Sequence, residues 1–82
     1  MFINEYFIVF PEGDVQEIPK RLPINELVDI NGCPLEFPLL THRMIVFRVS
    51  RIQVKESRGG NETFHFLELL SAEELKPYVQ RG

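Results

Sequence analysis

Hydrophobic residues first cluster at residues 2–10, FINEYFIVF, which we interpret as a β-strand. Its odd positions carry Ile3, Phe7 and Val9, and its even positions carry Phe2, Tyr6, Ile8 and Phe10. Side chains alternate between the two faces of a strand, so both faces of this one are apolar after Glu5. Such a pattern is typical of a strand that is covered on both sides, here by another layer or by another subunit.

The next segments alternate between short apolar runs and turn signals. Residues 11–14 predict a turn, 15–18 a short strand, and 19–23 a crossing loop with proline at both ends. Residues 27–30 predict a strand that ends in Asn31-Gly32, a strong two-residue hairpin signal. That loop would pair Ile30 with Cys33 and Asp29 with Pro34, which places the proline where no ladder hydrogen bond is needed.

The longest predicted strand is 43–55, RMIVFRVSRIQVK. Its apolar positions change parity at Ser50-Arg51, which predicts a β-bulge there. Residues 63–70 would return beside it, with Gly59-Gly60 as the loop of the hairpin. In that register the facing pairs are Ile52 with Leu67, Val54 with His65, Lys55 with Phe64, Gln53 with Phe66, and Arg51 with Glu68.

The C-terminal segment predicts one short helix. Ser71 and Glu74 have the spacing of a capping box, so the helix should start at Ala72. Pro77 limits it to one or two turns. The elements together predict a single small domain, 1–82, that is mainly β. We expect a small antiparallel barrel or a strongly bent sheet of about five to six short strands with this helix against one side.

Composition limits the class of protein. Apolar residues make up 44% of the chain, with seven Phe and no Trp, which excludes a disordered chain. Cys33 is the only cysteine, so no internal disulfide can form and the reducing cytoplasm is the expected location. The apolar start lacks a basic segment and a cleavage site, and it is too short to span a bilayer, so we expect neither a signal peptide nor a membrane partner.

Charge is unevenly distributed around a net value of −3. Residues 1–40 carry two basic and seven acidic side chains, whereas residues 41–60 carry five basic and one acidic. The basic middle would form internal or inter-subunit charge pairs, or an anion site. The acidic chain as a whole argues against non-specific affinity for nucleic acid.

The predicted hairpin places basic and aromatic residues on one face, which could stack bases and hold phosphates. The structural alternative is that the C-terminal helix or a second subunit covers the two phenylalanines, and this is the interpretation we favour. The candidate binding residues are Arg48, Arg51, Lys55, Arg58, Phe64 and Phe66.

No metal, cofactor or catalytic site is predicted. Cys33, His42 and His65 are the only thiol and imidazole groups, and their spacing matches no metal motif. Cys33 with either histidine would be the only thiol dyad available to an enzyme.

An excess of apolar residues leads to the main functional hypothesis. One short helix cannot cover two apolar sheet faces, and exposed apolar patches usually mark interfaces. We therefore expect a non-catalytic interaction module whose partner is a protein or a second copy of the chain. An anion or a single-stranded nucleic acid is the alternative ligand, and a closed barrel with an overfilled interior is the alternative structure. The candidate interface residues are Phe2, Tyr6, Phe10, Met44 and Val46.

Overall fold

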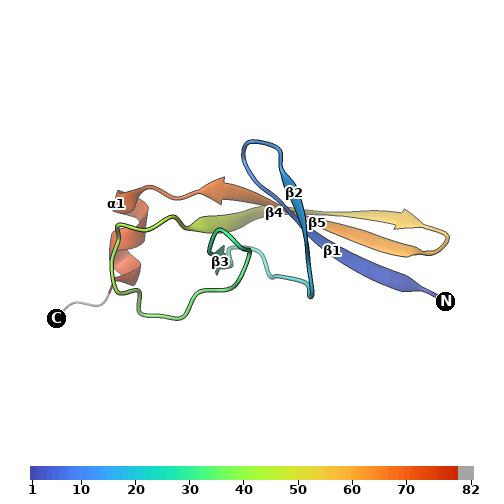
Figure 1. Cartoon of the computed structure of the whole chain (residues 1–82), viewed down its shortest axis with the longest axis horizontal. Coiled ribbons are helices and arrows are strands. Elements are labelled where there is room, and N and C mark those ends of the chain that lie inside the picture. Colours follow the sequence, from blue (N-terminus) through green and yellow to red (C-terminus); the bar gives the residue numbers. More distant parts are fainter. Residues whose placement is uncertain (80–82) are drawn as a thin grey trace.

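A five-stranded mixed sheet that bends into a half-barrel forms most of the chain (Figure 1). The computed structural model describes residues 1–79. The strand order is β2-β1-β5-β4-β3, and only the β1–β5 pairing is parallel. The predicted mainly β, largely antiparallel fold with a short C-terminal helix is therefore confirmed. The elements are β1 (Ile3–Val9), β2 (Val15–Ile18), β3 (Leu27–Val28), β4 (Phe47–Ser57), β5 (Gly60–Leu69), the helix α1 (Ala72–Leu75) and the 3₁₀ turn η1 (Lys76–Tyr78).

Strands β1 and β5 lie side by side although they are far apart in the sequence. Their pairing runs from Ile3 opposite Gly60 to Val9 opposite Phe66. At the start of this pairing, the Ile3 amide donates to the Gly59 carbonyl at 2.8 Å. A side chain at position 60 would overlap the Ile3 carbonyl. The φ angle of Gly60 is +151°, which residues with a side chain rarely adopt. This glycine is therefore required for the close approach of β1.

The β4–β5 hairpin is present, but its predicted register is wrong. Ser57 pairs with Gly60, so the loop is Arg58-Gly59 and not Gly59-Gly60. Gly60 is already part of β5, where β1 needs it. Compared with the predicted register, each residue of β4 from Arg51 onward faces a partner two positions earlier in β5. Because this shift is even, each side chain stays on its predicted face. Ile52 therefore faces His65, Val54 faces Thr63, and Arg51 faces Phe66.

The β-bulge predicted in β4 is confirmed. The register shifts between Val49 and Arg51, which leaves Ser50 as the extra residue. The Ser50 hydroxyl donates to the Phe66 carbonyl at 3.0 Å. The bulge brings Val49 and Ile52 to the same side of the sheet despite their different parity.

The turn at Asn31-Gly32 forms, but with a three-residue loop. Asp29 and Cys33 are bonded through their backbone at 3.0 Å, and Gly32 has a φ of +78°. The Asp29 carboxylate accepts from the amides of Asn31 and Cys33, which stabilises this longer loop over the predicted two-residue one. Pro34 consequently bridges to Val28 instead of Asp29, still at a position without a ladder bond of its own.

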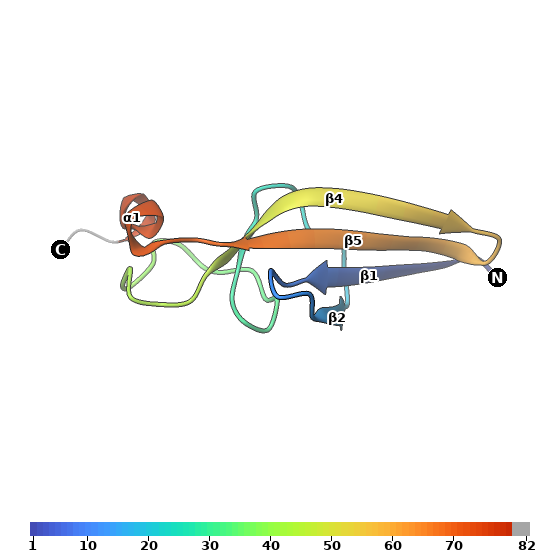
Figure 2. The same cartoon turned by 90° about the horizontal axis from the view of Figure 1, so that it is seen from above.

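We call the two sides of the sheet the inner face and the outer face. The inner face carries Ile8, Ile18 and Leu67, and it packs against Leu22 and Val28 from the segments that follow β2. Figure 2 shows these loops on the far side of the sheet. The outer face carries Phe7, Phe64 and Phe66, whose alternation places them on the opposite side.

A second core lies past the end of the β4–β5 pairing, where α1 packs against the segments next to these strands. Leu75 of the helix is fully buried with Val46 and Leu70, and the capping box of Ser71 and Glu74 is confirmed. The Ser71 hydroxyl accepts from the Glu74 amide at 3.2 Å, and the Ser71 amide donates to the Glu74 carboxylate at 3.0 Å. The box starts α1 where predicted, and Pro77 opens the 3₁₀ turn that follows.

Candidate functional site

The outer face of the sheet is the candidate site, because no described element covers it (Figure 2). Its side chains form three rows that run across the strands from β2 or β1 to β4. The first row is Val15, Val9, Phe66 and Arg51; the second is Glu17, Phe7, Phe64 and Gln53; the third is Glu5, Glu62 and Lys55.

Aromatic side chains dominate the centre of this outer face. The rings of Phe7 and Phe64 stack with centroids 5.1 Å apart and planes inclined by 17°. The Arg51 guanidinium lies over the Phe66 ring, 4.2 Å from its centroid. These three rings remain only half-buried, since they are shielded by one another and not by a second layer. They form an apolar surface that a binding partner could cover.

Apart from Glu62, the charges in the three rows of the outer face lie on opposite sides of the aromatic centre. Arg51 and Lys55 lie on β4, whereas Glu5 lies on β1 and Glu17 on β2. Glu62 of β5 stands directly opposite Lys55. The outer face therefore has a basic border and an acidic border.

The predicted basic-aromatic set is only partly brought together. Arg51, Lys55, Phe64 and Phe66 share the outer face, and Arg58 lies in the turn at its end. Arg48 forms an ion pair with Glu68, and its distance to the Glu74 carboxylate is 3.9 Å. The predicted Arg51–Glu68 pair is wrong, because the corrected register places Phe66 opposite Arg51.

The five candidate interface residues do not form one exposed patch. Phe2 is exposed, whereas Tyr6 and Phe10 pack against the inner core and Met44 packs against the second core. Val46 is fully buried between Leu39, Leu70 and Leu75, so its assignment to an exposed surface is wrong.

Sequence reasoning missed Phe7, Val9 and Val15 as candidate binding residues. They belong to the uncovered rows, and Val15 is 56% exposed. The apolar residues on both faces of 2–10 were the only signal. That pattern does not reveal which face the loops cover.

His65 has a structural environment on the inner face. It is fully buried, and its Nε2 accepts from the Leu22 amide at 3.0 Å. Its Nδ1 lies 2.8 Å from the Phe7 carbonyl, to which it donates. Both ring nitrogens are therefore bonded to backbone groups and not to the exposed Cys33 thiol. Among residues 1–79, no three His, Cys, Asp or Glu side chains are grouped as metal ligands would be.

Two acidic groups near the C-terminus are electrostatically stabilised. The Ser71 backbone amide and hydroxyl lower the pKa of Glu74, and the nearby Arg48 guanidinium adds to this effect. A hydrogen bond from Lys76, at 2.9 Å, and its charge lower the pKa of Glu73. Both carboxylates are exposed, and they stabilise the helix start without forming a pocket.

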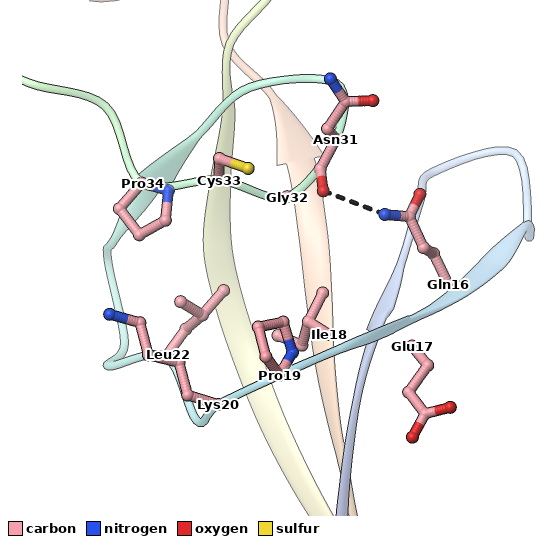
Figure 3. A pocket seen from close by; sticks show the side chains of 10 residues that line it. All are labelled: Gln16, Glu17, Ile18, Pro19, Lys20, Leu22, Asn31, Gly32, Cys33 and Pro34. Atoms are coloured by element: carbon pink, nitrogen blue, oxygen red, sulfur yellow. Dashed lines mark hydrogen bonds between the residues drawn. The ribbon is translucent and has the colours of Figure 1, made fainter.

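Hollows in the surface differ in size and in lining. The hollow in Figure 3 has a volume of about 110 Å³ and lies between β2 and the 29–33 turn, which are joined by a bond from the Gln16 amide to the Asn31 carbonyl. Ligand pockets usually exceed roughly 300 Å³. A wider hollow of about 480 Å³ is formed by residues 35–41 and Met44, and mostly apolar side chains line it.

Comparison with known proteins identifies a family. No curated protein and no solved structure matches the chain. In the part of the chain that the structure describes, no helix is long and apolar enough to cross a membrane. One family profile, described as "Uncharacterised Treponema protein", matches residues 2–78. Because this match spans nearly all of the 82 residues, the chain belongs to that family.

Proposed function

We propose that this chain is a non-catalytic protein-interaction module that associates with a second copy of itself through the outer face. The observation that carries the proposal is the uncovered aromatic centre of Phe7, Phe64 and Phe66. A monomer leaves part of the surface of these rings in contact with water. Burying apolar surface contributes about 25 cal/mol per Å², so a partner over this face would be stabilised. The proposed compartment is the reducing cytoplasm, in keeping with the single, exposed Cys33.

Charge complementarity favours a second copy as the partner. Consider two outer faces packed together about a twofold axis that runs along the strands between them. The basic border of each copy then lies over the acidic border of the other, so Arg51 and Lys55 approach Glu5 and Glu17. Such a self-complementary patch is what a twofold-symmetric interface requires.

The size of the outer face sets the expected strength. Four strands at about 4.8 Å spacing and seven residues at about 3.4 Å rise give roughly 450 Å² in projection. A standard interface buries about 800 Å² of accessible surface per partner, so this interface lies at the lower end of the range. We therefore expect a weak dimer, with a dissociation constant in the micromolar range.

Sedimentation equilibrium over micromolar to millimolar concentrations tests this proposal. Phe64→Thr removes the central ring of the outer face and should shift the chain to the monomer. Val54→Thr is the matched control, because Val54 lies on the inner side of the neighbouring strand and is 44% exposed. A wild-type chain that stays monomeric at millimolar concentration, or a Phe64→Thr variant that dimerises normally, would refute the proposal.

A single-stranded nucleic acid is the second candidate ligand of the same face. The stacked Phe7 and Phe64 rings and the Arg51–Phe66 contact support it, since bases stack on such groups. The glutamates of the outer face oppose it through repulsion of phosphate. Titration with oligouridine at two salt concentrations tests it, using an Arg51→Ala, Lys55→Ala, Arg58→Ala triple variant. Binding that is absent at low salt, or unchanged in the triple variant, removes this candidate.

A further inference from the structure

The second half of β4 is a free edge of the sheet. On one side β5 pairs with β4 along its whole length. On the other side β3 pairs only with Phe47 and Arg48, and the last neighbours are Asn25 and Glu26, which bond to Val49. Figure 2 shows β4 at the border of the sheet with no strand beside its far half.

The backbone bonds of Val49 fix which groups point outward at this edge. Its carbonyl accepts from Asn25 at 2.8 Å and its amide donates to Glu26 at 2.9 Å, so both point away from β5. Hydrogen-bonded and non-bonded pairs alternate along an antiparallel ladder. Val49 is therefore in a non-hydrogen-bonded pair with β5. The alternation continues along β5 past the bulge in β4, so the pairs of Arg51, Gln53 and Lys55 are hydrogen-bonded.

The intervening residues Ile52, Val54 and Glu56 must therefore direct their amides and carbonyls away from β5. None of these backbone groups has a hydrogen-bond partner within residues 1–79. No proline or bulge interrupts the stretch, since the bulge lies before it at Ser50. A row of this kind is a template on which an extended peptide can add as a further strand.

Side chains along the edge indicate the chemistry of the incoming strand. On the outer side the edge presents Arg51 and Lys55, with Arg58 at the tip, whereas the carboxylate of β4, Glu56, has the inner parity. On the inner side it presents the apolar Ile52 and Val54, followed by Glu56 near the hairpin turn. A matching strand would therefore alternate acidic residues, beside the cations, with apolar residues, beside the aliphatic side chains.

A second β4 fits this edge poorly. An antiparallel pair centred on Val54 would place Lys55 diagonally across from Lys55 and Arg51 of the other copy, where like charges repel. Centring the pair on Gln53 or Lys55 would set cations directly opposite each other. We propose that the free edge of β4 binds an extended peptide segment of alternating acidic and apolar residues by β-strand addition. This inference does not depend on self-association through the outer face.

Fluorescence anisotropy with two labelled peptides tests this inference. The probe is a capped eight-residue peptide that alternates valine and glutamate, and its counterpart alternates valine and lysine. We expect the glutamate peptide to bind and the lysine peptide not to bind. Binding of both peptides alike, or of neither, would overturn the inference.

Substitutions at Val54 test the role of the edge backbone. Val54→Pro removes an outward amide without removing a bond to β5, and proline is tolerated at such edge positions. It should weaken peptide binding by about tenfold or more, whereas Val54→Thr, which keeps the amide, should bind as the wild type does. If folded Val54→Pro binds the glutamate peptide as tightly as the wild type does, the inference is contradicted. If this variant does not fold, a glutamate peptide N-methylated on alternate amides replaces it, and undiminished binding of that peptide is the contradicting result.

Two further measurements distinguish peptide binding at the edge from self-association. Phe64→Thr should bind the glutamate peptide at least as tightly as the wild type does, even where it abolishes self-association, so failure of one proposal does not imply failure of the other. Sedimentation of Val54→Pro identifies the competing occupant. Loss of dimers in this variant, with Phe64→Thr still dimeric, would assign the edge to a second copy and overturn the peptide proposal.

Discussion

Replacing His65 by phenylalanine should destabilise the fold through one unsatisfied backbone amide. The wild-type imidazole is fully buried and accepts from the Leu22 amide at 3.0 Å. Since an amide can only donate, Nε2 must be the acceptor and Nδ1 must carry the proton given to Phe7. Phenylalanine keeps an aromatic ring at this position but supplies neither bond. The Leu22 amide is then left without a partner in the interior.

The expected loss of folding stability follows from the Leu22 amide that is left without an acceptor. A buried polar group that loses its partner costs about 1–3 kcal/mol. The Phe7 carbonyl adds less, because it is only part-buried. With a urea m-value of about 1–3 kcal/mol per molar for a small domain, a loss of 2 kcal/mol lowers the midpoint by roughly 1 M.

Urea unfolding and amide hydrogen exchange measure this effect. The exchange rate at Leu22 should rise in His65→Phe more than at other core amides, since this bond ties the crossing loop to β5. His65→Gln is the matched variant, because its side-chain oxygen can accept at about the position of Nε2, and it should recover part of the loss. The reasoning is refuted if His65→Phe unfolds at the wild-type midpoint, or if glutamine gives no recovery over phenylalanine.

Three other changes test separate parts of the fold. Gly60→Ala should destabilise and free the start of β1, because its added carbon overlaps the Ile3 carbonyl; Gly59→Ala meets nothing within 4 Å and should be nearly neutral in urea unfolding. Glu74→Gln should be less stable than the wild type at pH values above 4.5, the ordinary carboxyl pKa. This difference in stability should vanish as the pH falls through the lower pKa that Glu74 has in the folded state, and a difference that does not depend on pH would contradict the reasoning. Arg48→Ala should cost no more than about 1 kcal/mol in urea unfolding, because its ion pair with Glu68 is partly exposed, and a larger loss would show that the pair is effectively buried.

Period-two alternation was sufficient to predict which residues share a face of the hairpin. Ile52 and Val54 lie with His65, and Arg51 and Lys55 lie with Phe64, although the predicted register was wrong. The register error arose from assigning Gly60 to the turn. Position 60 must lack a side chain because Ile3 of β1 packs against it, and Ile3 is 57 positions away in the sequence. No local pattern reveals such a contact.

The candidate site was harder to predict for a related reason. A strand with two apolar faces does not indicate which face the loops will cover. Residues 19–35 cover the side of Tyr6 and Ile8, so the exposed apolar surface belongs to Phe7 and Val9. Val46 likewise became a core residue because Leu75, which is distant in sequence, packs around it together with Leu39.

Strand β4 contributes to both proposed surfaces through alternating residues. The side chains of Arg51 and Lys55 border the outer face, while the backbone of Ile52, Val54 and Glu56 forms the free edge. A strand added at the edge would extend the sheet and place its acidic side chains beside that basic border. Those acidic groups would compete with Glu5 and Glu17 of a second copy for the same cations. Peptide binding and self-association should therefore weaken each other, and because such coupling is reciprocal, each must reduce the other by the same factor.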